Sequence, residues 1–244
     1  MVVQSQSLLD DGERQRLRDQ YSEIATLAGG LAHEIKNPLS TISMNLELMA
    51  EDLADADSPR DHRLLTKIQS VQTECRQLDE ILNAFLQFAR VGELDLVSAD
   101  LNDIVRKFID FYGSNAAEAQ LEIRSHLPSN LPPVLLDRSL VRQALLNLAI
   151  NAQQAMPQGG LLEFQTYHRE GRVFLEVIDS GGGMDEKTRA KMFHAFFSTK
   201  AAGSGLGLPT VRKIVEAHNG SITCESEPGQ GTRFTISLPM ATTK

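Results

Sequence analysis

The chain has no tryptophan and only two cysteines, Cys75 and Cys224, among its 244 residues. The two cysteines lie far apart, and neither belongs to a CxxC pair or to another spacing typical of metal ligands. We therefore expect buried thiols in a reducing compartment and no disulfide framework.

Long apolar runs are also missing. No run of about 18 apolar residues occurs anywhere in the chain. The first residues, MVVQSQSLLDDGERQRLRDQ, lack the basic start and apolar core of a leader peptide. We expect no membrane insertion, and either a cytoplasmic protein or the cytoplasmic part of a longer one.

Basic residues are the minority among the charges. The 24 Lys and Arg face 32 Asp and Glu, which gives a net charge of -8 and disfavours nucleic acid and anionic membranes as partners. With 41% hydrophobic and 23% charged residues, the composition is that of a folded soluble protein. The length allows one large domain or two modest ones.

The first third of the chain has a helical pattern. Apolar residues step by three or four from about Gly12 to Ala54, the segment Asp55–Asp61 interrupts them, and a heptad repeat follows from Leu64 to Ala89. Two long helices with a short loop predict an antiparallel hairpin. Its apolar face is wider than one partner helix can cover, which favours a homodimer that forms a four-helix bundle; the alternative is a coiled-coil spacer.

The first helix contains the stretch TLAGGLAHEIKNPLS, with His33 on the face opposite its apolar seam. With an ordinary histidine pKa of about 6.5, the ring is mostly neutral at pH 7 and can act as a nucleophile. Glu34 can hold one ring N–H, and Asn37 lies one turn further on the same face. Pro38 bends the helix at a cost of about 3 kcal/mol. The alternative is a solvated histidine before a proline that starts a new helix.

After Val91 and Gly92 the periodicity changes, which indicates a linker and a second domain. The first half of this domain is expected to contain a strand, a helix whose inward residues include Phe111, two further strands, and a helix capped by Asp137. The four elements before the capped helix are expected over Leu94–Val97, Leu101–Ala119, Leu121–Leu127 and Val134–Leu136.

Asn147 and Asn151 lie one turn apart on the helix after Asp137, in line with Gln143 and Gln154. Asparagine is unfavourable inside a helix because its amide competes for backbone hydrogen bonds. Two of them four residues apart therefore indicate a function, and the alternative is a solvated polar face.

Two strands, Leu161–Tyr167 and Arg172–Ile178, lead into Asp179 and three glycines. A carboxylate at a strand end, followed by glycines, lets the backbone approach a flat ligand that donates a hydrogen bond to the carboxylate. The alternative is an ordinary glycine-rich turn.

A second glycine loop, Gly203–Leu208, precedes a helix over Pro209–Ala217. Free backbone N–H groups and the helix dipole favour phosphate oxygens there, although the Walker A pattern is absent. His218 indicates an ordinary helix end. The hairpin Ser221–Ser226 and Thr232–Leu238 closes the domain.

In order, the motifs HEIKNP, NLAINA, DSGGGM, FHAFFSTK and GSGLGL resemble the histidine protein kinases of two-component signalling, over about Ala25 to Pro239. NAQQAMPQGG is most similar to the nitrogen-regulation type. The resemblance implies three parts: residues 1–20 as a lead-in without a recognisable sensor, 21–91 as a dimerisation and histidine phosphotransfer hairpin, and 92–244 as an α/β sandwich ATP-binding domain of the gyrase, chaperone and histidine-kinase type.

The resemblance also implies roles for single residues. His33 matches the phosphoacceptor, Glu34 its adjacent base, and Asn37 a residue often needed for phosphatase activity. In the ATP domain, Asn151 matches the Mg²⁺ ligand and Asp179 the residue that reads adenine. The remaining residues expected at the ATP site are Asn147, Gly181, Gly183, Phe193, Lys200, Gly203, Gly205, Leu206 and Gly207.

Asn147 stands where related ATPases carry a water-activating glutamate, so the site is expected to hold ATP for transfer rather than hydrolyse it. His194 and Ala195 stand where the family commonly has an acidic residue and proline. The implied function is autophosphorylation of His33 from Mg-ATP and transfer to an aspartate of a response regulator receiver domain, with phosphatase activity toward that regulator. The alternative is a phosphatase-dominant relative or a non-catalytic dimeric scaffold.

Overall fold

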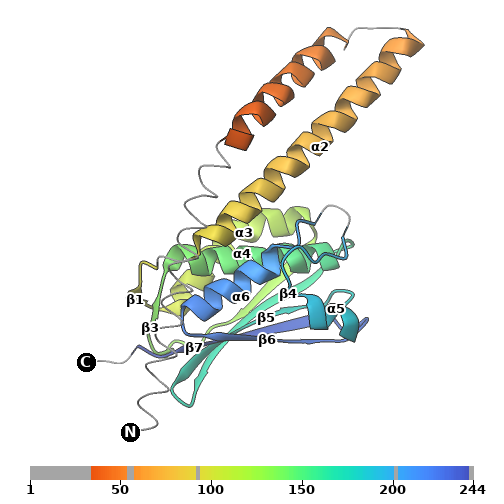
Figure 1. Ribbon diagram of the computed structural model, residues 1–244. Coiled ribbons are helices and arrows are strands. Elements are labelled where there is room, and N and C mark those ends of the chain that lie inside the picture. Colours follow the sequence, from red (N-terminus) through yellow and green to blue (C-terminus); the bar gives the residue numbers. More distant parts are fainter. Residues whose placement is uncertain (1–33, 54–57, 92–93, 201–202, 242–244) are drawn as a thin grey trace. The chain divides into compact units, whose positions relative to one another are not determined.

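The computed structural model describes residues 34–53, 58–91, 94–200 and 203–241. Two compact units divide the chain, Met1–Gly92 and Glu93–Lys244, and each is described by itself (Figure 1). We call them the helical unit and the sheet unit. His33 and the expected start of the first helix lie outside the described residues.

The helical unit contains a helix over residues 34–52 and α2, Pro59–Arg90. Ser58 caps α2 by accepting a hydrogen bond from the Asp61 backbone N–H at 3.2 Å. The predicted end of the loop over Asp55–Asp61 is wrong, because α2 already begins at Pro59. Proline suits that position because the first N–H of a helix has no intrahelical acceptor anyway.

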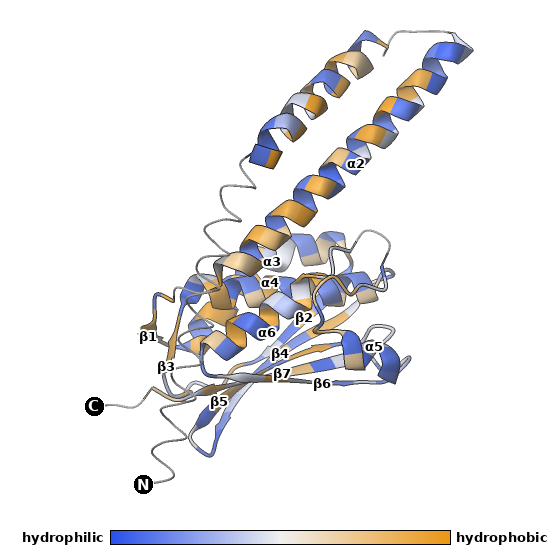
Figure 2. Cartoon of the chain, viewed as in Figure 1, coloured by the Kyte–Doolittle hydropathy of each residue, from blue (hydrophilic) through white to orange (hydrophobic). Residues whose placement is uncertain are grey.

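Large apolar side chains stay exposed on both helices of this unit. Met44 is 62% exposed on the first helix and Leu78 is 56% exposed on α2. Hydrophobic and hydrophilic residues form alternating bands along both helices (Figure 2). The hairpin therefore has more apolar surface than its own two helices cover.

The sheet unit is built on a five-stranded mixed sheet in the order β2-β4-β5-β7-β6. β2 and β4 are parallel and the other neighbours are antiparallel. The strands are β2 Leu121–His126, β4 Gly160–Arg169, β5 Arg172–Asp179, β6 Ser221–Ser226 and β7 Thr232–Pro239, and a separate antiparallel pair joins β1 Val97–Ala99 to β3 Val134–Leu136.

Three helices, α3, α4 and α6, cover one face of this sheet (Figure 1). Their bounds are Leu101–Glu118, Arg138–Ala155 and Gly207–Ala217, and the short α5, Glu186–Lys191, follows β5. Burial alternates along β5, with Val173, Leu175 and Val177 facing the helices. The expected fold class, a helical hairpin followed by an α/β sandwich, is confirmed.

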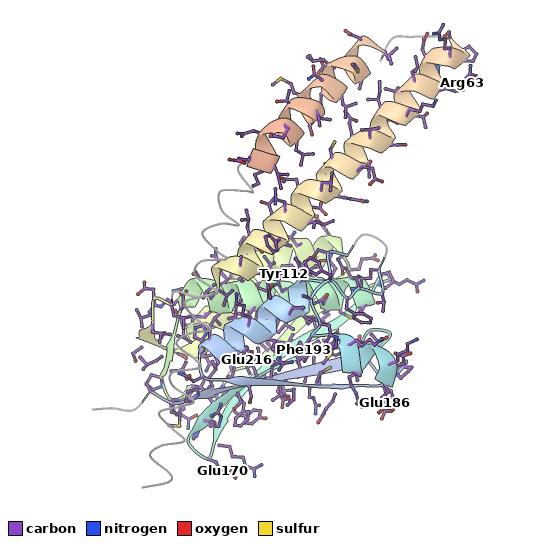
Figure 3. All side chains as sticks on the ribbon, in the orientation of Figure 1. Arg63, Tyr112, Glu170, Glu186, Phe193 and Glu216 are labelled. Atoms are coloured by element: carbon purple, nitrogen blue, oxygen red, sulfur yellow. The ribbon has the colours of Figure 1, made fainter. Side chains whose placement is uncertain are left out.

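Two local expectations in the sheet unit are wrong. Phe111 is 59% exposed instead of inward, and Tyr112 takes the buried position. The Tyr112 hydroxyl donates to the Gln153 side-chain oxygen of α4, and the Arg142 guanidinium lies 5.6 Å from the centre of the Phe111 ring (Figure 3 labels Tyr112). The first strand begins at Val97 instead of Leu94.

Both cysteines are free thiols, and only Cys75 is buried as expected. Cys75 is buried on α2 and Cys224 is half-buried on β6. Burial raises the pKa of the Cys224 thiol to about 12, so this thiol is not activated as a nucleophile at neutral pH.

Gly183 lets the loop after β5 pack closely against the turn between β6 and β7. Its φ is +65°, and an added Cβ would lie 1.9 Å from the Glu227 carbonyl oxygen. Ser226 reinforces the contact, because its hydroxyl accepts from the Met184 N–H at 2.9 Å and donates to the Gly231 carbonyl at 2.9 Å.

We therefore expect Gly183→Ala to destabilise the sheet unit by more than about 3 kcal/mol, through left-handed backbone strain and main-chain overlap. Thermal unfolding measures this as a fall of about 10 °C. Gly182→Ala is the matched control, because a Cβ at Gly182 meets no atom within 4 Å. Equal melting temperatures for the two variants would contradict the argument.

Candidate functional site

Three segments far apart in the sequence meet at one end of the helical layer. They are the end of β5 with the glycines after it, the second half of α4, and the loop that enters α6. The contacts that join them give the geometry of the candidate site.

Asp179 is the last residue of β5 and is only 7% exposed. Its Oδ1 accepts a hydrogen bond from the Gly181 N–H at 2.9 Å. Burial raises the pKa of this carboxyl, while hydrogen bonds from the Gly181 and Thr232 backbones and the Lys200 charge oppose the rise. Such a carboxylate gains from a ligand that donates a hydrogen bond to it.

Gly181 and Gly231 pack where no side chain fits. A Cβ on Gly181 would lie 2.8 Å from the Ala155 Cβ, at the end of α4. On the other side, a Cβ on Gly231 would lie 2.0 Å from the Asp179 carbonyl oxygen. The loop is therefore held between α4 and the β6–β7 turn, with bare backbone beside the Asp179 carboxylate.

α4 contributes the two asparagines. Asp137 caps this helix, with its Oδ1 accepting from the Ser139 N–H at 2.9 Å and the Leu140 N–H at 3.1 Å. The Asn147 side-chain amide donates to the Gly207 carbonyl at 3.3 Å, and so holds the loop that enters α6. Asn151 is half-exposed, and its Nδ2 lies 3.8 Å from where a Gly207 Cβ would stand.

Lys200 brings a positive charge to this cluster. Its ammonium donates to the Gln154 side-chain oxygen at 2.6 Å, on the same helix as the two asparagines. Burial lowers the pKa of Lys200, and the nearby Asp179 carboxylate opposes that shift. The lysine therefore links the segment before the glycine loop to both α4 and Asp179.

The phenylalanine segment lies beside α5 and α6. Phe193 is half-buried, with the Arg212 guanidinium of α6 5.8 Å from its ring centre (Figure 3 labels Phe193). Phe196 is 66% exposed and has a φ of +64°. Its backbone N–H donates to the Gly205 carbonyl at 3.0 Å, which ties this segment to the glycine loop.

The glycine loop leads directly into α6. Gly205 has a φ of +67°, and a Cβ there would lie 2.5 Å from the Phe196 carbonyl carbon. Leu206 is fully buried and anchors the loop, while Gly207 begins the helix. The first N–H groups of a helix have no intrahelical acceptors, so this end of α6 suits anionic oxygens. Gly203, an exposed residue at the start of the loop, completes the glycines of the motif.

On the helical unit, Glu34 and Asn37 are exposed on helix 34–52. The Asn37 backbone carbonyl accepts a hydrogen bond from the Thr41 hydroxyl at 3.1 Å, one turn further along the helix. His33 precedes the described part of this helix. The helical face expected to carry the phosphoacceptor is thus accessible at the two described positions.

Sequence reasoning missed two contributors to the site on the sheet unit, and it missed the burial of one histidine outside the site. Gln154 was placed in line with the asparagines but was given no role. The Thr232 backbone donor opposite Asp179 had no sequence signal, because strand register is a tertiary property. His218, expected as an ordinary helix end, is buried at 3% exposure.

Among the described residues, no group of three His, Cys, Asp or Glu side chains could hold a metal ion. No helix within the described ranges is long and apolar enough to span a membrane.

Two protein families match the chain. Residues 136–242 match the family described as histidine kinase-, DNA gyrase B- and HSP90-like ATPase. Residues 23–94 match the His Kinase A (phospho-acceptor) domain.

Curated relatives match almost the whole chain. It is 32% identical over 232 residues to the signal transduction histidine-protein kinase AtoS of Escherichia coli K12, covering 93% of this chain and 37% of AtoS. It is 31% identical over 242 residues to the sensor histidine kinase ZraS of the same organism, covering 99% of this chain and 50% of ZraS. The chain thus spans half or less of the length of these relatives.

Solved structures resemble the chain as well. Full-length ShkA in complex with AMPPNP gives a TM-score of 0.70 at 29% identity, covering 90% of this chain and 47% of ShkA. The histidine kinase ThkA in complex with the response regulator protein TrrA gives 0.66 at 25% identity, covering 95% of this chain and 66% of ThkA.

Proposed function

This chain belongs to the sensor histidine kinases of two-component signalling and comprises a catalytic core of that family, and from this premise we propose that it transfers the γ-phosphoryl group of ATP to His33. The phosphoryl group then passes to an aspartate of a response regulator receiver domain. Residues 21–91 serve as the dimerisation and phosphotransfer hairpin, residues 92–244 bind ATP, and residues 1–20 lead into the hairpin.

The observation that carries the nucleotide assignment is the buried Asp179 carboxylate, bordered by glycine backbone and with the Lys200 charge nearby. A purine amine can donate to this carboxylate, and the flat ring can lie against bare backbone at Gly181 and Gly183. The start of α6 at Gly207 then offers N–H groups to the phosphates, and Lys200 offers a positive charge.

Asn151 is the residue that would hold Mg²⁺. Magnesium keeps several waters and binds through one or two protein oxygens plus substrate phosphates, which fits a single amide better than a cluster of carboxylates. When bound, the ion would neutralise charge on the phosphate oxygens.

The protein takes little part in the covalent chemistry of the transfer. A ring nitrogen of His33 attacks the γ-phosphorus in line with the bridging oxygen; a nitrogen–phosphorus bond forms, the bond to ADP breaks, and the electron pair leaves with ADP. Glu34 holds the other ring N–H and so keeps the attacking lone pair free. Positioning and charge neutralisation supply most of the rate.

Asn147 favours transfer over hydrolysis. An amide is not a general base, and this one donates its N–H to the Gly207 carbonyl, so it cannot take a proton from water. The site therefore lacks, at this position, the general base that hydrolysis of bound ATP would need. A hinge is expected near Val91–Glu93, where residues 92 and 93 lie outside the described ranges, and it would allow His33 to approach the bound ATP.

Partners follow from the same proposal. The exposed apolar side chains of the helical hairpin are buried in a homodimer that forms a four-helix bundle, in the cytoplasm. A receiver domain is supported as the acceptor because ThkA, a similar structure, forms a complex with a response regulator. The net charge of -8 supports neither nucleic acid nor membrane as a partner.

A second activity is favoured by Asn37. Its exposed amide, one turn from His33, can orient a water toward a phosphorylated receiver domain, which would give phosphatase activity toward the regulator. A phosphatase-dominant protein would release phosphate from the regulator without accumulating phosphohistidine, and a non-catalytic scaffold would bind no nucleotide.

The proposal is tested by incubating the full chain with γ-labelled ATP and Mg²⁺. We expect covalent label that is lost in acid and retained in base, as a phosphohistidine behaves, and that moves to a receiver domain on mixing. Label with the opposite stability would indicate another acceptor. Release of free phosphate without labelled protein would overturn the kinase assignment in favour of hydrolysis.

A further inference from the structure

A hydrogen bond ties helices α4 and α6 together at the nucleotide end. The Asn147 amide, midway along α4, donates to the carbonyl of Gly207, the first residue of α6. Every residue proposed to touch phosphate or metal on these helices lies near this tie. The relative position of the two helices therefore sets the distance between Asn151 and the N–H groups of α6.

A second tie joins the opposite ends of the same helices. His218, the residue that ends α6, is buried, and its Nε2 lies 2.9 Å from the backbone nitrogen of Asp137, the residue that caps α4. Its Nδ1 lies 2.7 Å from the Ile214 carbonyl oxygen. These partners assign the tautomer, because Nδ1 must donate to the carbonyl and Nε2 must accept from the Asp137 N–H.

Both carboxylate oxygens and the backbone N–H of Asp137 take part in this arrangement. One carboxylate oxygen caps α4, and the other accepts from the Asp95 backbone N–H at 3.1 Å. The backbone N–H of Asp137 itself goes to His218. Buried and satisfied on three sides, Asp137 gives α4 a fixed starting point, and His218 attaches the end of α6 to that point.

The two ties lie equally far apart along both helices. Ten residues separate Asp137 from Asn147 on α4 and eleven separate Gly207 from His218 on α6, which is about 15 Å at 1.5 Å per residue. Ties at both ends oppose sliding and rotation of one helix along the other.

Packing between the helices is incomplete beside His218. A small apolar cavity lies beside His218, lined among others by Val141 and Ala144 of α4 and Ile214 of α6. Apolar contacts are non-directional, and a void lets neighbouring side chains shift. The hydrogen bond from the Asp137 N–H to the His218 ring adds a directional restraint at this end.

We propose that His218, acting through Asp137, is a positioning residue for the nucleotide site: it sets the offset of α6 against α4 and so aligns Gly207 with Asn147 and Asn151. The inference rests on the proposed function, since nucleotide is what the aligned residues bind. Without the tie, the nucleotide must align the helices at the expense of its own binding energy.

Two variants that differ by one methylene separate this role from general stability. In His218→Gln the side-chain oxygen reaches the ring Nε2 position and can still accept from the Asp137 N–H. In His218→Asn the amide reaches only the Nδ1 position, so the bond to Ile214 survives and the tie is lost. Thr166→Val is the matched control, because it breaks the equally buried Thr166–Asn102 bond between β4 and α3, away from the site.

We expect His218→Asn to weaken binding of a fluorescent ADP analogue, and of ATP in competition, by about 10-fold, and His218→Gln to stay within about 3-fold of wild type. Thr166→Val should lower the melting temperature yet bind within about 2-fold. In the labelling assay, His218→Asn should raise the KM for ATP with the rate at saturating ATP within about 2-fold of wild type.

Wild-type binding in His218→Asn, or equal weakening in Thr166→Val, would overturn the positioning role. If His218→Asn fails to fold, hydrogen exchange of the wild-type chain provides the test. Nucleotide is expected to slow exchange of the Asp137 backbone amide proton at least about 5-fold, because coupling between the two ends of the helices is reciprocal. Unchanged exchange there counts against the proposal. A wild-type chain that binds no nucleotide would instead refute the proposed function.

Discussion

Replacing His33 by alanine is expected to abolish the acid-labile label from γ-labelled ATP, with a loss of at least about 1,000-fold, because alanine has no lone pair to form the nitrogen–phosphorus bond. Nucleotide affinity should remain that of wild type, since Asp179, Asn151 and the glycine loop belong to the other unit. Labelling by filtration and nucleotide binding by fluorescence measure the two effects on the same sample.

The other histidines make this a specific expectation. Both ring nitrogens of His218 are occupied and the ring is buried. His126 contacts the Glu163 carboxylate at 3.1 Å on the sheet. His62 is exposed in the first turn of α2, with Nδ1 3.1 Å from the Ser58 carbonyl. His62→Ala is therefore the control, expected to label as wild type does.

Label that persists in His33→Ala and disappears in His62→Ala would reverse the assignment of the phosphoacceptor. Label that persists in both would point to an exposed histidine of the sheet unit, where His168 and His194 lie at the surface. Either outcome would mean that ATP bound to the sheet unit does not phosphorylate the histidine of the HEIKNP stretch.

Sequence reasoning found the elements of the site because their signals are local. An asparagine pair inside a helix, and a strand that ends in Asp179 and three glycines, depart from what each element prefers. Departures of this kind mark functional positions, since a residue that is unfavourable locally needs another reason to be there.

What the sequence did not reveal depends on tertiary contacts. Phe111 and Tyr112 are both spaced to reach the core from Phe108, at three and four residues, and helical periodicity does not distinguish them. The Tyr112 hydroxyl finds an acceptor in Gln153, which lies 41 residues further along the chain. Phenylalanine at that position could not use this acceptor.

His218 shows the same limit at the site itself. At the end of a helix and before a glycine, a histidine usually interacts with the last carbonyls, and this one does bond to Ile214. Its second bond reaches Asp137, 81 residues earlier in the chain. Only the packing of α6 on α4 brings that backbone N–H within reach, so no local pattern could have predicted it.

Asp179→Asn is expected to weaken binding of ADP and ATP by about 100-fold or more, and to remove labelling of His33 at ordinary ATP concentrations. The amide keeps one oxygen for the Gly181 N–H, but it presents a donor where the carboxylate accepted from the base. Isothermal titration with each nucleotide, and the shift in melting temperature on adding nucleotide, measure the loss. Asp179 is buried, so water cannot compensate for the missing acceptor.

Glu176→Gln is the matched control. It makes the same change of charge and shape on the same strand, but on the opposite face, where Glu176 accepts from the Tyr167 hydroxyl at 3.0 Å and lies 3.7 Å from Arg233. We expect it to bind nucleotide as wild type does. Equal losses in both variants would mean that the effect comes from the strand and not from the carboxylate.

The pH dependence of stability gives a further check on the same residue. Because burial raises the pKa of Asp179 above its unfolded value, the folded chain binds this proton more tightly than the unfolded chain. At a pH above the raised pKa, the ionised carboxylate therefore lowers the stability of the folded chain. That cost disappears as the pH falls through the raised pKa toward the ordinary pKa of an aspartate. Relative to Asp179→Asn, the melting temperature of nucleotide-free wild type should rise on acidification in that window. A difference that is independent of pH would show that Asp179 is not the desolvated acceptor on which adenine recognition depends.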